Sequence, residues 1–335
     1  MNEPSLQGEI GANIERDFTM NAYHAAHNGA VLVDLSQRGR ILLQDRDRVD
    51  LVNRMSTNNL TQLAAGEGVA TVLTTPIGRM IDVLVFLNIG EESLIITGEG
   101  RGDIILDYFR RNIFFNDRVQ ITEISSRTRL IGVYGVDADR IVGEWIPDVE
   151  ALSEYNSIEY DGARLINAEP LASRGMWILC DSPDARKWES RLLEAGAVRA
   201  DAETYELLSI EAGYPLTSHE LTDDYIPLEA GLWHSVSFSK GCYTGQEVIA
   251  RMESRGKLAK MLVRLAVDEE MPEGAALFDD KKKVGTLTSL RQRPDGGYLG
   301  LGYVSAPSVS EKNVLMGENG ARLKIIGIAG TQPER

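Results

Sequence analysis

One stretch of the sequence gathers residue types that can do chemistry. It reads SVSFSKGCYTGQEVIARMESRGK over residues 235–257 and places Cys242 close to Lys240 and between two glycines. A thiolate is a nucleophile and a metal ligand, and a nearby ammonium group or helix N-terminus favours it over the thiol. Thr244 and Glu247 have the spacing of a capping box, which predicts a helix that begins at about Thr244. The stretch therefore predicts either a reactive cysteine or a small buried one beside a capped helix.

Cations concentrate in the same region. The segment from residue 240 to residue 264 contains six lysines and arginines and two glutamates. Its local charge is therefore +4, in a chain with a formal net charge of −15. Such a segment is typical either of a solvated surface or of a site for an anionic ligand. The charge of the whole chain disfavours nucleic acid and anionic membranes as partners.

Patterns of other catalytic sites are missing from the sequence. The histidines do not complete a zinc-ligand set with the cysteines, no serine lies in a nucleophile-elbow pattern, and the glycine patterns that bind phosphate are absent. The two cysteines, Cys180 and Cys242, are far apart and suit a reducing compartment. Residues 1–18 lack the pattern of a signal peptide, and the most apolar run, around Asp82, is about half the length of a membrane helix. We therefore expect a soluble, cytoplasmic protein.

The elements around the motif read as alternating short strands and helices. Over residues 30–215, short turns join neighbouring strand-like runs, which favours antiparallel pairing. The runs AVLVDLS and GRILLQ predict two strands around a turn at residues 37–39, and DAETYELLSIEAG predicts a helix that Gly213 closes. These features predict the α+β class.

The pattern changes from Leu258 onward. Short strand-like runs separated by Gly, Pro and Asp predict a separate small β-barrel or sandwich. We therefore expect an α+β region over residues 1–257, made of two subdomains with breaks near 128–138 and 200, and a β domain over residues 258–335. The cysteine motif lies just before that boundary, where sites between domains commonly form.

The run PLEAGLWHSVSFSKGCYTGQEVIARM closely resembles the signature of the folate-binding YgfZ family, relatives of the glycine cleavage system T-protein. The likeness extends to LVDLSQRGRILLQDRDRVDLVNRMSTNNLTQL, to GRMIDVLVF and to the final β domain, so it covers most of the chain. It implies a ring of α+β, ferredoxin-like subdomains with tetrahydrofolate in the central opening, followed by an antiparallel β-barrel. It also implies a role in assembly or repair of iron–sulfur proteins, with client or assembly proteins as partners.

The resemblance carries site residues onto this sequence. The positions that match the family motif and the segment before it are Lys240, Cys242, Tyr243, Gly245, Gln246, Glu247, Arg251, Pro227, Glu229 and Gly231. The T-protein has two adjacent aspartates in the strand equivalent to GRMIDVLVF. Asp82 matches the first, and Val83 stands at the second, which is the acid beside the folate. Trp177 falls where the T-protein has a glutamate that reads the pterin, and Ser209 where relatives usually have arginine. We assign Asp82, Trp177 and the motif residues to folate binding, and Cys242 to a reactive role.

Three functions are consistent with these residues. The first is a folate-binding accessory protein in which the cationic segment receives the glutamate tail of folate. The second is a folate-dependent aminomethyltransferase or demethylase. That chemistry needs a carboxylate beside the attacking nitrogen, which Val83 cannot supply, and Asp82 is expected on the opposite face of the strand. The third is a binding module without chemistry, in which Cys242 is structural.

Overall fold

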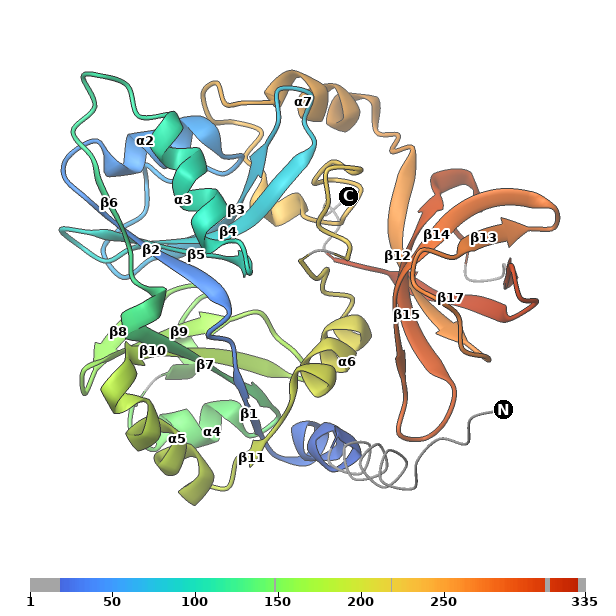
Figure 1. Cartoon of the computed structure of the whole chain (residues 1–335), viewed down its shortest axis with the longest axis horizontal. Coiled ribbons are helices and arrows are strands. Elements are labelled where there is room, and N and C mark those ends of the chain that lie inside the picture. The colour runs from blue at the N-terminus through green and yellow to red at the C-terminus, as the bar shows by residue number, and fades with distance from the viewer. Residues whose placement is uncertain (1–18, 148, 218, 311–313, 331–335) are drawn as a thin grey trace, which may run out of the picture.

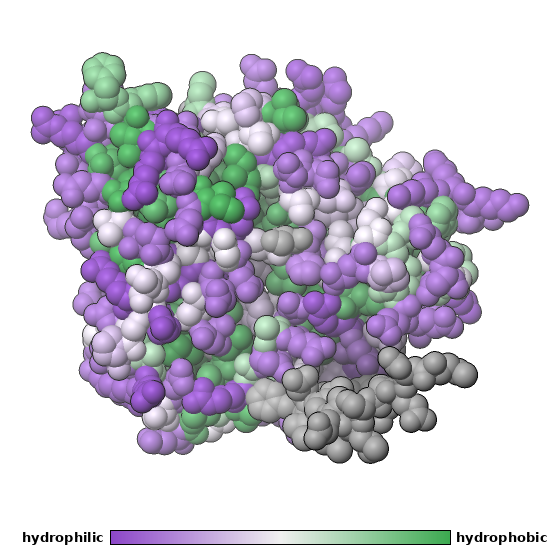
Figure 2. Space-filling model, in the orientation of Figure 1, coloured by the Kyte–Doolittle hydropathy of each residue, from purple (hydrophilic) through white to green (hydrophobic). Residues whose placement is uncertain are grey.

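The computed structural model describes residues 19–147, 149–217, 219–310 and 314–330. Two open sheets with their helices lie side by side, and a closed barrel lies next to them (Figure 1). Hydrophilic side chains cover most of the face seen in Figure 2, with apolar ones in small groups. None of the helices in the described ranges combines the length and apolar character needed to cross a membrane. The prediction about a signal peptide concerns residues 1–18, which lie outside the described residues.

The first sheet has five strands in the order β3-β4-β5-β2-β6. Their bounds are β2 Arg38–Gln44, β3 Gly68–Thr74, β4 Met80–Asn88, β5 Ser93–Glu99 and β6 Gln120–Glu123. The helices α2 (Arg48–Met55) and α3 (Gly102–Arg111) share an apolar core with one face of this sheet, where Leu84 and Phe86 of β4 lie. Because side chains alternate along a strand, Val83 and Val85 face the other side, toward the second sheet.

The second sheet has six strands in the order β11-β1-β7-β10-β9-β8. Their bounds are β1 Val31–Asp34, β7 Thr128–Gly135, β8 Ser157–Tyr160, β9 Ala163–Ala168, β10 Arg174–Asp181 and β11 Val198–Arg199. The helices α4 (Ala138–Gly143) and α5 (Ala185–Glu194) share a core with this sheet, centred on the fully buried Trp188. The strands β8, β9 and β11 were not among the predicted elements.

The predicted pairing around residues 37–39 is wrong, although both strands exist. The strand β1 pairs with β7 and β11, whereas β2 pairs with β5 and β6 in the other sheet. Residues 35–37 therefore carry the chain from one sheet to the next, and the start of β2 lies between the two sheets. This crossing places Arg38 at the site described below.

The helix α6 (Ala202–Ala212) lies between the second sheet and the barrel (Figure 1). The carboxylate of Asp201 accepts a hydrogen bond from the Thr204 N–H at 2.7 Å and caps its start. Gly213, in the left-handed conformation with φ of 72°, closes the helix as predicted. Residues 19–28 are also helical.

The barrel closes in the order β12-β15-β14-β13-β16-β17, with all its pairs antiparallel. Its strands are β12 Lys260–Val267, β13 Ala276–Asp279, β14 Lys282–Gln292, β15 Tyr298–Ser305, β16 Val314–Gly317 and β17 Arg322–Ile328. The remaining elements are α7 Gln246–Arg255 and the 3-10 turns Ser125–Arg127, Val149–Ala151, Ser182–Asp184, Trp233–Ser235 and Ala306–Ser308. The predicted α+β class with a C-terminal β-barrel is confirmed.

A candidate ligand-binding cavity

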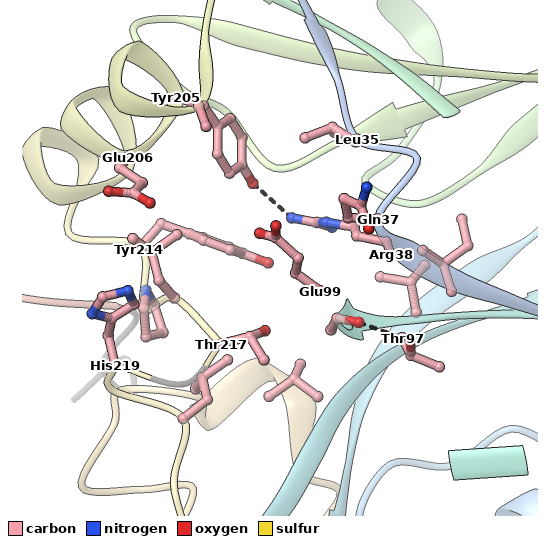
Figure 3. Close-up of a pocket in the computed structure, with 18 of the residues that line it drawn as sticks. Leu35, Gln37, Arg38, Thr97, Glu99, Tyr205, Glu206, Tyr214, Thr217 and His219 are labelled. Carbon is pink, nitrogen blue, oxygen red and sulfur yellow. Dashed lines mark hydrogen bonds between the residues drawn. The ribbon is translucent and has the colours of Figure 1, made fainter. Parts of the chain in front are cut away.

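A cavity opens between the two sheets and α6 (Figure 3). Its empty volume is about 1010 Å³, counting space open to solvent. The apolar part of its wall comes from Val33, Leu35, Val83, Val85, Ile96, Pro215, Leu216, Leu221 and Leu232. Polar groups join this wall from the start of β2, the end of β5, α6, residues 214–217 and His219. An apolar hollow with a few converging polar groups is the usual form of a small-molecule site.

Arg38 brings a guanidinium group into the wall of this cavity. Its Nη2 atom donates to the Tyr205 hydroxyl at 2.6 Å and to Glu169 Oε1 at 3.2 Å. Its Cζ atom lies 4.7 Å from the centroid of the Trp177 ring, which is cation–π distance. Burial alone would lower the pKa of Arg38, but Tyr205, Glu169, Tyr134 and Tyr214 together raise that pKa well above its ordinary value.

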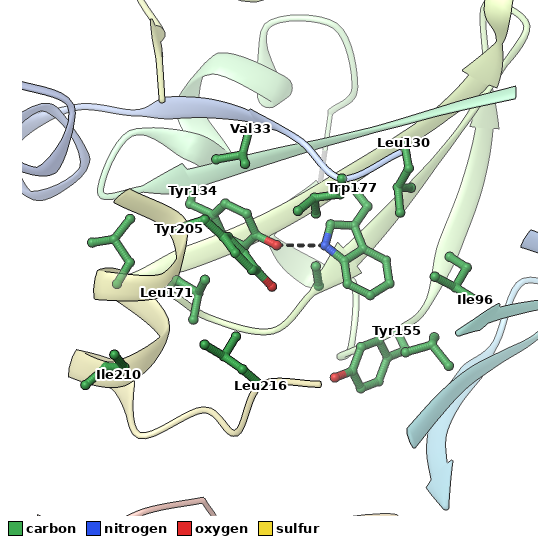
Figure 4. Packing of buried hydrophobic residues seen from close by; sticks show 14 of the residues in the cluster. Val33, Ile96, Leu130, Tyr134, Tyr155, Leu171, Trp177, Tyr205, Ile210 and Leu216 are labelled. Carbon is green, nitrogen blue, oxygen red and sulfur yellow. Dashed lines mark hydrogen bonds between the residues drawn. The ribbon is translucent and has the colours of Figure 1, made fainter. Parts of the chain in front are cut away.

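The Trp177 ring, which contacts Arg38, packs in a buried cluster near Tyr134 and Tyr205, and Figure 4 shows these three aromatic side chains. The Trp177 indole N–H donates to the Tyr134 hydroxyl at 2.8 Å, and Tyr134 donates to Glu169 Oε1 at 3.1 Å. Tyr205 donates to the same oxygen at 3.1 Å. Trp177, predicted to contact folate, is fully buried and does not line the cavity. The Trp177 ring instead contacts the guanidinium group of Arg38, which lines the cavity.

Sequence reasoning missed Arg38, Glu169 and the tyrosines. Glu169 directly follows β9, a strand that was not predicted, and its fully buried carboxylate is 131 residues from Arg38. A buried carboxylate is rare unless it is paired, so a buried Glu169 would have indicated a functional site. Its burial could not be predicted, because the strand that precedes it was not predicted. Ser209 lies one turn after Tyr205 in α6. It is buried, and its hydroxyl donates to the Tyr205 carbonyl oxygen at 2.8 Å.

Asp82 lies against the wall of the cavity, close to Val83. Its Oδ2 accepts from the Gly98 N–H at 3.1 Å, and its Oδ1 accepts from the Val83 N–H at 3.0 Å. A Cβ atom added to Gly98, which lines the cavity, would lie 2.6 Å from Asp82 Oδ1 and 2.5 Å from Thr217 Oγ1. Burial raises the pKa of Asp82 to about 6.

The expectation that Asp82 and Val83 face opposite sides of the strand stays a prediction, because Val83 lines the cavity and Asp82 is not among the lining residues. The β3–β4 pairing shifts register at Ile81, since Leu73 pairs with Asp82 and Thr74 with Met80, whereas Asp82 and Val83 pair with consecutive residues of β3. Val83 lines the cavity, and the Asp82 carboxylate reaches the neighbouring wall residue Gly98. Thr217 lines both this cavity and a second hollow beside Met80, Ile81 and Arg101.

Carboxylates also lie around the cavity, and one of them is tied to the barrel. The lining includes Asp34, Glu99 and Glu206. Glu206 Oε2 accepts from Arg291 Nε of β14 at 2.6 Å, so α6 and the barrel are joined by an ion pair at this edge. Arg291 Nη1 also donates to Glu273 at 2.8 Å. The described charged side chains of the lining are therefore mainly acidic.

Lys240 anchors the cysteine motif to the first sheet's helix. Its ammonium group donates to the carbonyl oxygens of Asn53 at 2.6 Å, Ser56 at 2.9 Å and Asn58 at 2.6 Å, in the last turn of α2 and just after it. Burial lowers the pKa of Lys240 to about 8. Lys240 therefore does not belong to the predicted cationic surface, because its ammonium group already donates hydrogen bonds to three carbonyl oxygens.

The start of α7 corrects the capping-box prediction. The helix begins at Gln246, and Gly245 occupies the N-cap position with φ of 84° and no side-chain cap. Thr244 instead offers its carbonyl oxygen to the Thr74 hydroxyl at 2.6 Å. A left-handed glycine, rather than a capping side chain, turns the chain into the helix. Tyr243 is buried beside it with Ile226, Leu228, Val236 and Ile249.

The other motif residues lie at or near the surface. Cys242, Glu247 and Arg251 are exposed, and Gln246 is partly exposed. Glu229 is buried, where it accepts from the Ile226 N–H at 3.3 Å and lies 3.9 Å from Arg79. Neither the residues from Lys240 to Arg251 nor Glu229 line the cavity beside Arg38, and their assignment to folate binding stays a prediction. Within the described residues, no group of three or more His, Cys, Asp or Glu could hold a metal ion.

Comparisons with known proteins identify the family. A model described as the GCVT N-terminal domain matches residues 12–240. An Arabidopsis thaliana protein named "Putative transferase At1g60990, chloroplastic" is 32% identical over 306 residues, which cover 89% of this chain and 71% of the relative. An aminomethyltransferase of Rubrobacter xylanophilus is 27% identical over 314 residues, covering 91% and 84%. The crystal structure of the glycine cleavage system aminomethyltransferase T from Bartonella henselae has the same fold, with a TM-score of 0.82 at 18% identity over 92% of this chain and 88% of that one. Because the matched residues span more than half of its length, the chain belongs to the GCVT N-terminal domain family.

Proposed function

We propose that this chain binds a reduced folate in the cavity beside Arg38 and transfers a one-carbon unit to or from it. The observation that carries the proposal is the cavity itself, lined by apolar side chains, two tyrosines and a fixed guanidinium group. Relatives named aminomethyltransferases, which align over most of this chain, support the same class of reaction.

The residues of the cavity fit such a ligand. A folate combines a flat heteroaromatic ring, which needs apolar walls, with a polar edge, which needs fixed hydrogen-bonding partners. Val83, Val85 and Ile96 would hold the ring, and Arg38 and the Tyr214 side chain would meet polar atoms. When bound, a reduced folate supplies the nitrogen atoms that carry one-carbon units.

Asp82 is the carboxylate that we assign to proton transfer. Val83 stands where the T-protein resemblance expects an acid, and an alkyl side chain cannot move a proton. The Asp82 carboxylate lies against Gly98 in the adjacent wall, and its pKa of about 6 is close to neutral pH. General acid–base groups work best when their pKa lies near the working pH. In this proposal Asp82 exchanges a proton with bound ligand beside Thr217.

Binding of tetrahydrofolate, measured by calorimetry, tests the first half of the proposal. We expect micromolar affinity for the wild type and at least about a tenfold loss in Val83→Phe, because the larger ring fills the cavity. Val136→Phe, at an exposed valine, is the matched control and should bind as the wild type does. No binding by the wild type, or equal binding by both variants, would contradict a folate site in this cavity.

Formation of methylene-tetrahydrofolate and ammonia from tetrahydrofolate and a small aminomethyl donor, a transfer that needs no oxidant, tests the second half. Asp82→Asn should lose activity by a factor of about 100 or more, the usual contribution of a general acid or base. Val83→Asp places a second carboxylate in the wall and should raise product formation. A folded Asp82→Asn variant with full activity would remove Asp82 from the mechanism.

A second candidate function rests on the exposed thiol of Cys242. Its loop follows the anchored Lys240, and its sequence is the part that resembles the YgfZ family. This resemblance supports an accessory role in assembly or repair of iron–sulfur proteins. One thiol cannot hold a cluster, which normally takes four ligands, so a client or assembly protein would supply the others.

The domain division and the location follow as parts of the proposal. We assign ligand binding to residues 1–257 and closure of one side of the cavity to the barrel, residues 258–335. The ion pair between Glu206 and Arg291 supports this division of roles. A cytoplasmic location and the lack of nucleic-acid partners stay predictions, and the Arabidopsis relative is named as chloroplastic.

A further inference from the structure

The guanidinium group of Arg38 is only partly used by the protein. Its Nη2 atom serves Tyr205 and Glu169. In the described part of the chain, Nε and Nη1 of Arg38 make no hydrogen bond, and neither atom is buried. Because Arg38 lines the cavity, these two donors are available to a ligand there. Figure 3 shows the guanidinium group pointing into the space between Tyr205 and Glu99.

The surrounding side chains hold that group in one orientation. The Trp177 ring covers its face, and Tyr205 and Glu169 hold its Nη2 end. Glu169 is itself held by Tyr134 and Tyr205, and its second oxygen has no partner among the described residues. A guanidinium group that is already ordered loses little freedom on binding, so its contacts contribute more to affinity.

The charges around the cavity indicate which ligand group Arg38 accepts. The Glu169 carboxylate already offsets the charge of Arg38, and Arg291 offsets that of Glu206, so the carboxylates of Asp34 and Glu99 add negative charge to the lining. An anionic ligand group would therefore meet a mainly negative surrounding, which repels it. A neutral acceptor, such as a ring oxo group, takes the two N–H donors without that repulsion.

We propose that Arg38 is the residue that selects the ligand of this cavity, by donating from Nε and Nη1 to the oxo-bearing edge of a neutral heteroaromatic ring. This inference rests on the proposed function, and for a reduced folate the group recognised is the 4-oxo group of the pterin. An analogue with an amino group at that position presents N–H donors to the N–H donors of Arg38, so no hydrogen bond forms between them. It leaves the Arg38 N–H groups unpaired when water is excluded.

The test compares tetrahydrofolate with its 2,4-diamino analogue by calorimetry on the full chain. The wild type should bind tetrahydrofolate about 10- to 100-fold more tightly, the range expected for a hydrogen bond from a charged donor. The double variant Arg38→Met/Glu169→Gln removes both charges together, so no carboxylate is left buried without its partner. Its preference should fall to about twofold or less. Arg46→Met, at an exposed arginine, is the control and should keep the wild-type preference.

A second variant keeps the inference testable if the double variant does not fold. Tyr205→Phe removes only the hydroxyl that orients Arg38, and it should reduce the preference for the 4-oxo ligand several-fold without weakening the diamino analogue. Equal binding of both ligands by the wild type, or an unchanged preference in a folded variant, overturns the role of Arg38 alone. Failure of the wild type to bind either ligand overturns the folate proposal, and this inference with it.

Discussion

The carboxylate of Asp82 accepts a hydrogen bond from the Gly98 N–H across the β4–β5 pair, at 3.1 Å. This contact draws a buried acid to the wall of the cavity and away from the neighbouring apolar core of α2 and α3. It places a carboxylate beside the cavity even though Val83 occupies the next position.

Asp82 should make stability depend on pH. Its pKa is raised from 3.8 to about 6 in the folded protein, so the folded state binds the proton more tightly than the unfolded state does. The favourable effect is complete below pH 3.8 and is lost as the pH rises through 6. Asp82→Asn removes this dependence. Relative to the wild type, the variant should gain about 1 kcal/mol in unfolding free energy between pH 5 and pH 8, measured by urea denaturation. A difference that does not change with pH would show that the acid titrates normally.

Lys240 should contribute to stability rather than to surface charge. Lys240→Met leaves three carbonyl oxygens at the C-terminal end of α2 without their donor, which should cost about 2–4 kcal/mol of unfolding free energy. Lys257→Met, at an exposed lysine later in the same motif, is the control and should stay within about 0.5 kcal/mol of the wild type. Equal stability of the two variants in urea denaturation would mean that the Lys240 contacts contribute nothing.

Gly245 should not tolerate a side chain. A Cβ atom there would lie 2.6 Å from the Thr75 carbonyl oxygen, in addition to the strain of the left-handed backbone. Gly256, at the other end of α7, has a left-handed φ of 58° but open space around it. Gly256→Ala should therefore cost about 1 kcal/mol and Gly245→Ala at least about twice that. Thermal unfolding of both variants measures the difference, and equal losses would show that the helix start shifts to make room.

Cys242 should react in the folded protein, and Cys180 should not. Cys242 is exposed, whereas Cys180 is buried and burial raises its pKa to about 11. Alkylation with iodoacetamide followed by mass spectrometry should label Cys242 first. Labelling at equal rates would contradict the surface loop described above.

Cys242→Ala separates the remaining functions. Because the side chain is exposed, the variant should unfold within about 0.5 kcal/mol of the wild type. A fall in cellular iron–sulfur enzyme activity at unchanged stability would support the accessory role. Unchanged activity would leave Cys242 without a chemical role, and would not affect the folate proposal.

Local patterns in the sequence determined the class of fold. The alternation of short strands and amphipathic helices, the glycine that closes α6, and the change to short strands after Leu258 each depend on neighbours within a few residues. The inward position of Val83 also follows from a period of two along β4. The resemblance placed the chain in the right superfamily, and the branch within it stays a prediction.

Only the tertiary structure decided which residues meet. Strands β1 and β2 are consecutive yet belong to different sheets, since hydrogen-bonding partners of a strand are not encoded in its own period. The Arg38–Glu169 pair spans 131 residues and the Lys240–Asn53 contact spans 187, so no local spacing announces either one. A charged residue reads in sequence as exposed because burial is costly without a partner. Its partner, and therefore its role, exists only once the sheets have been brought together.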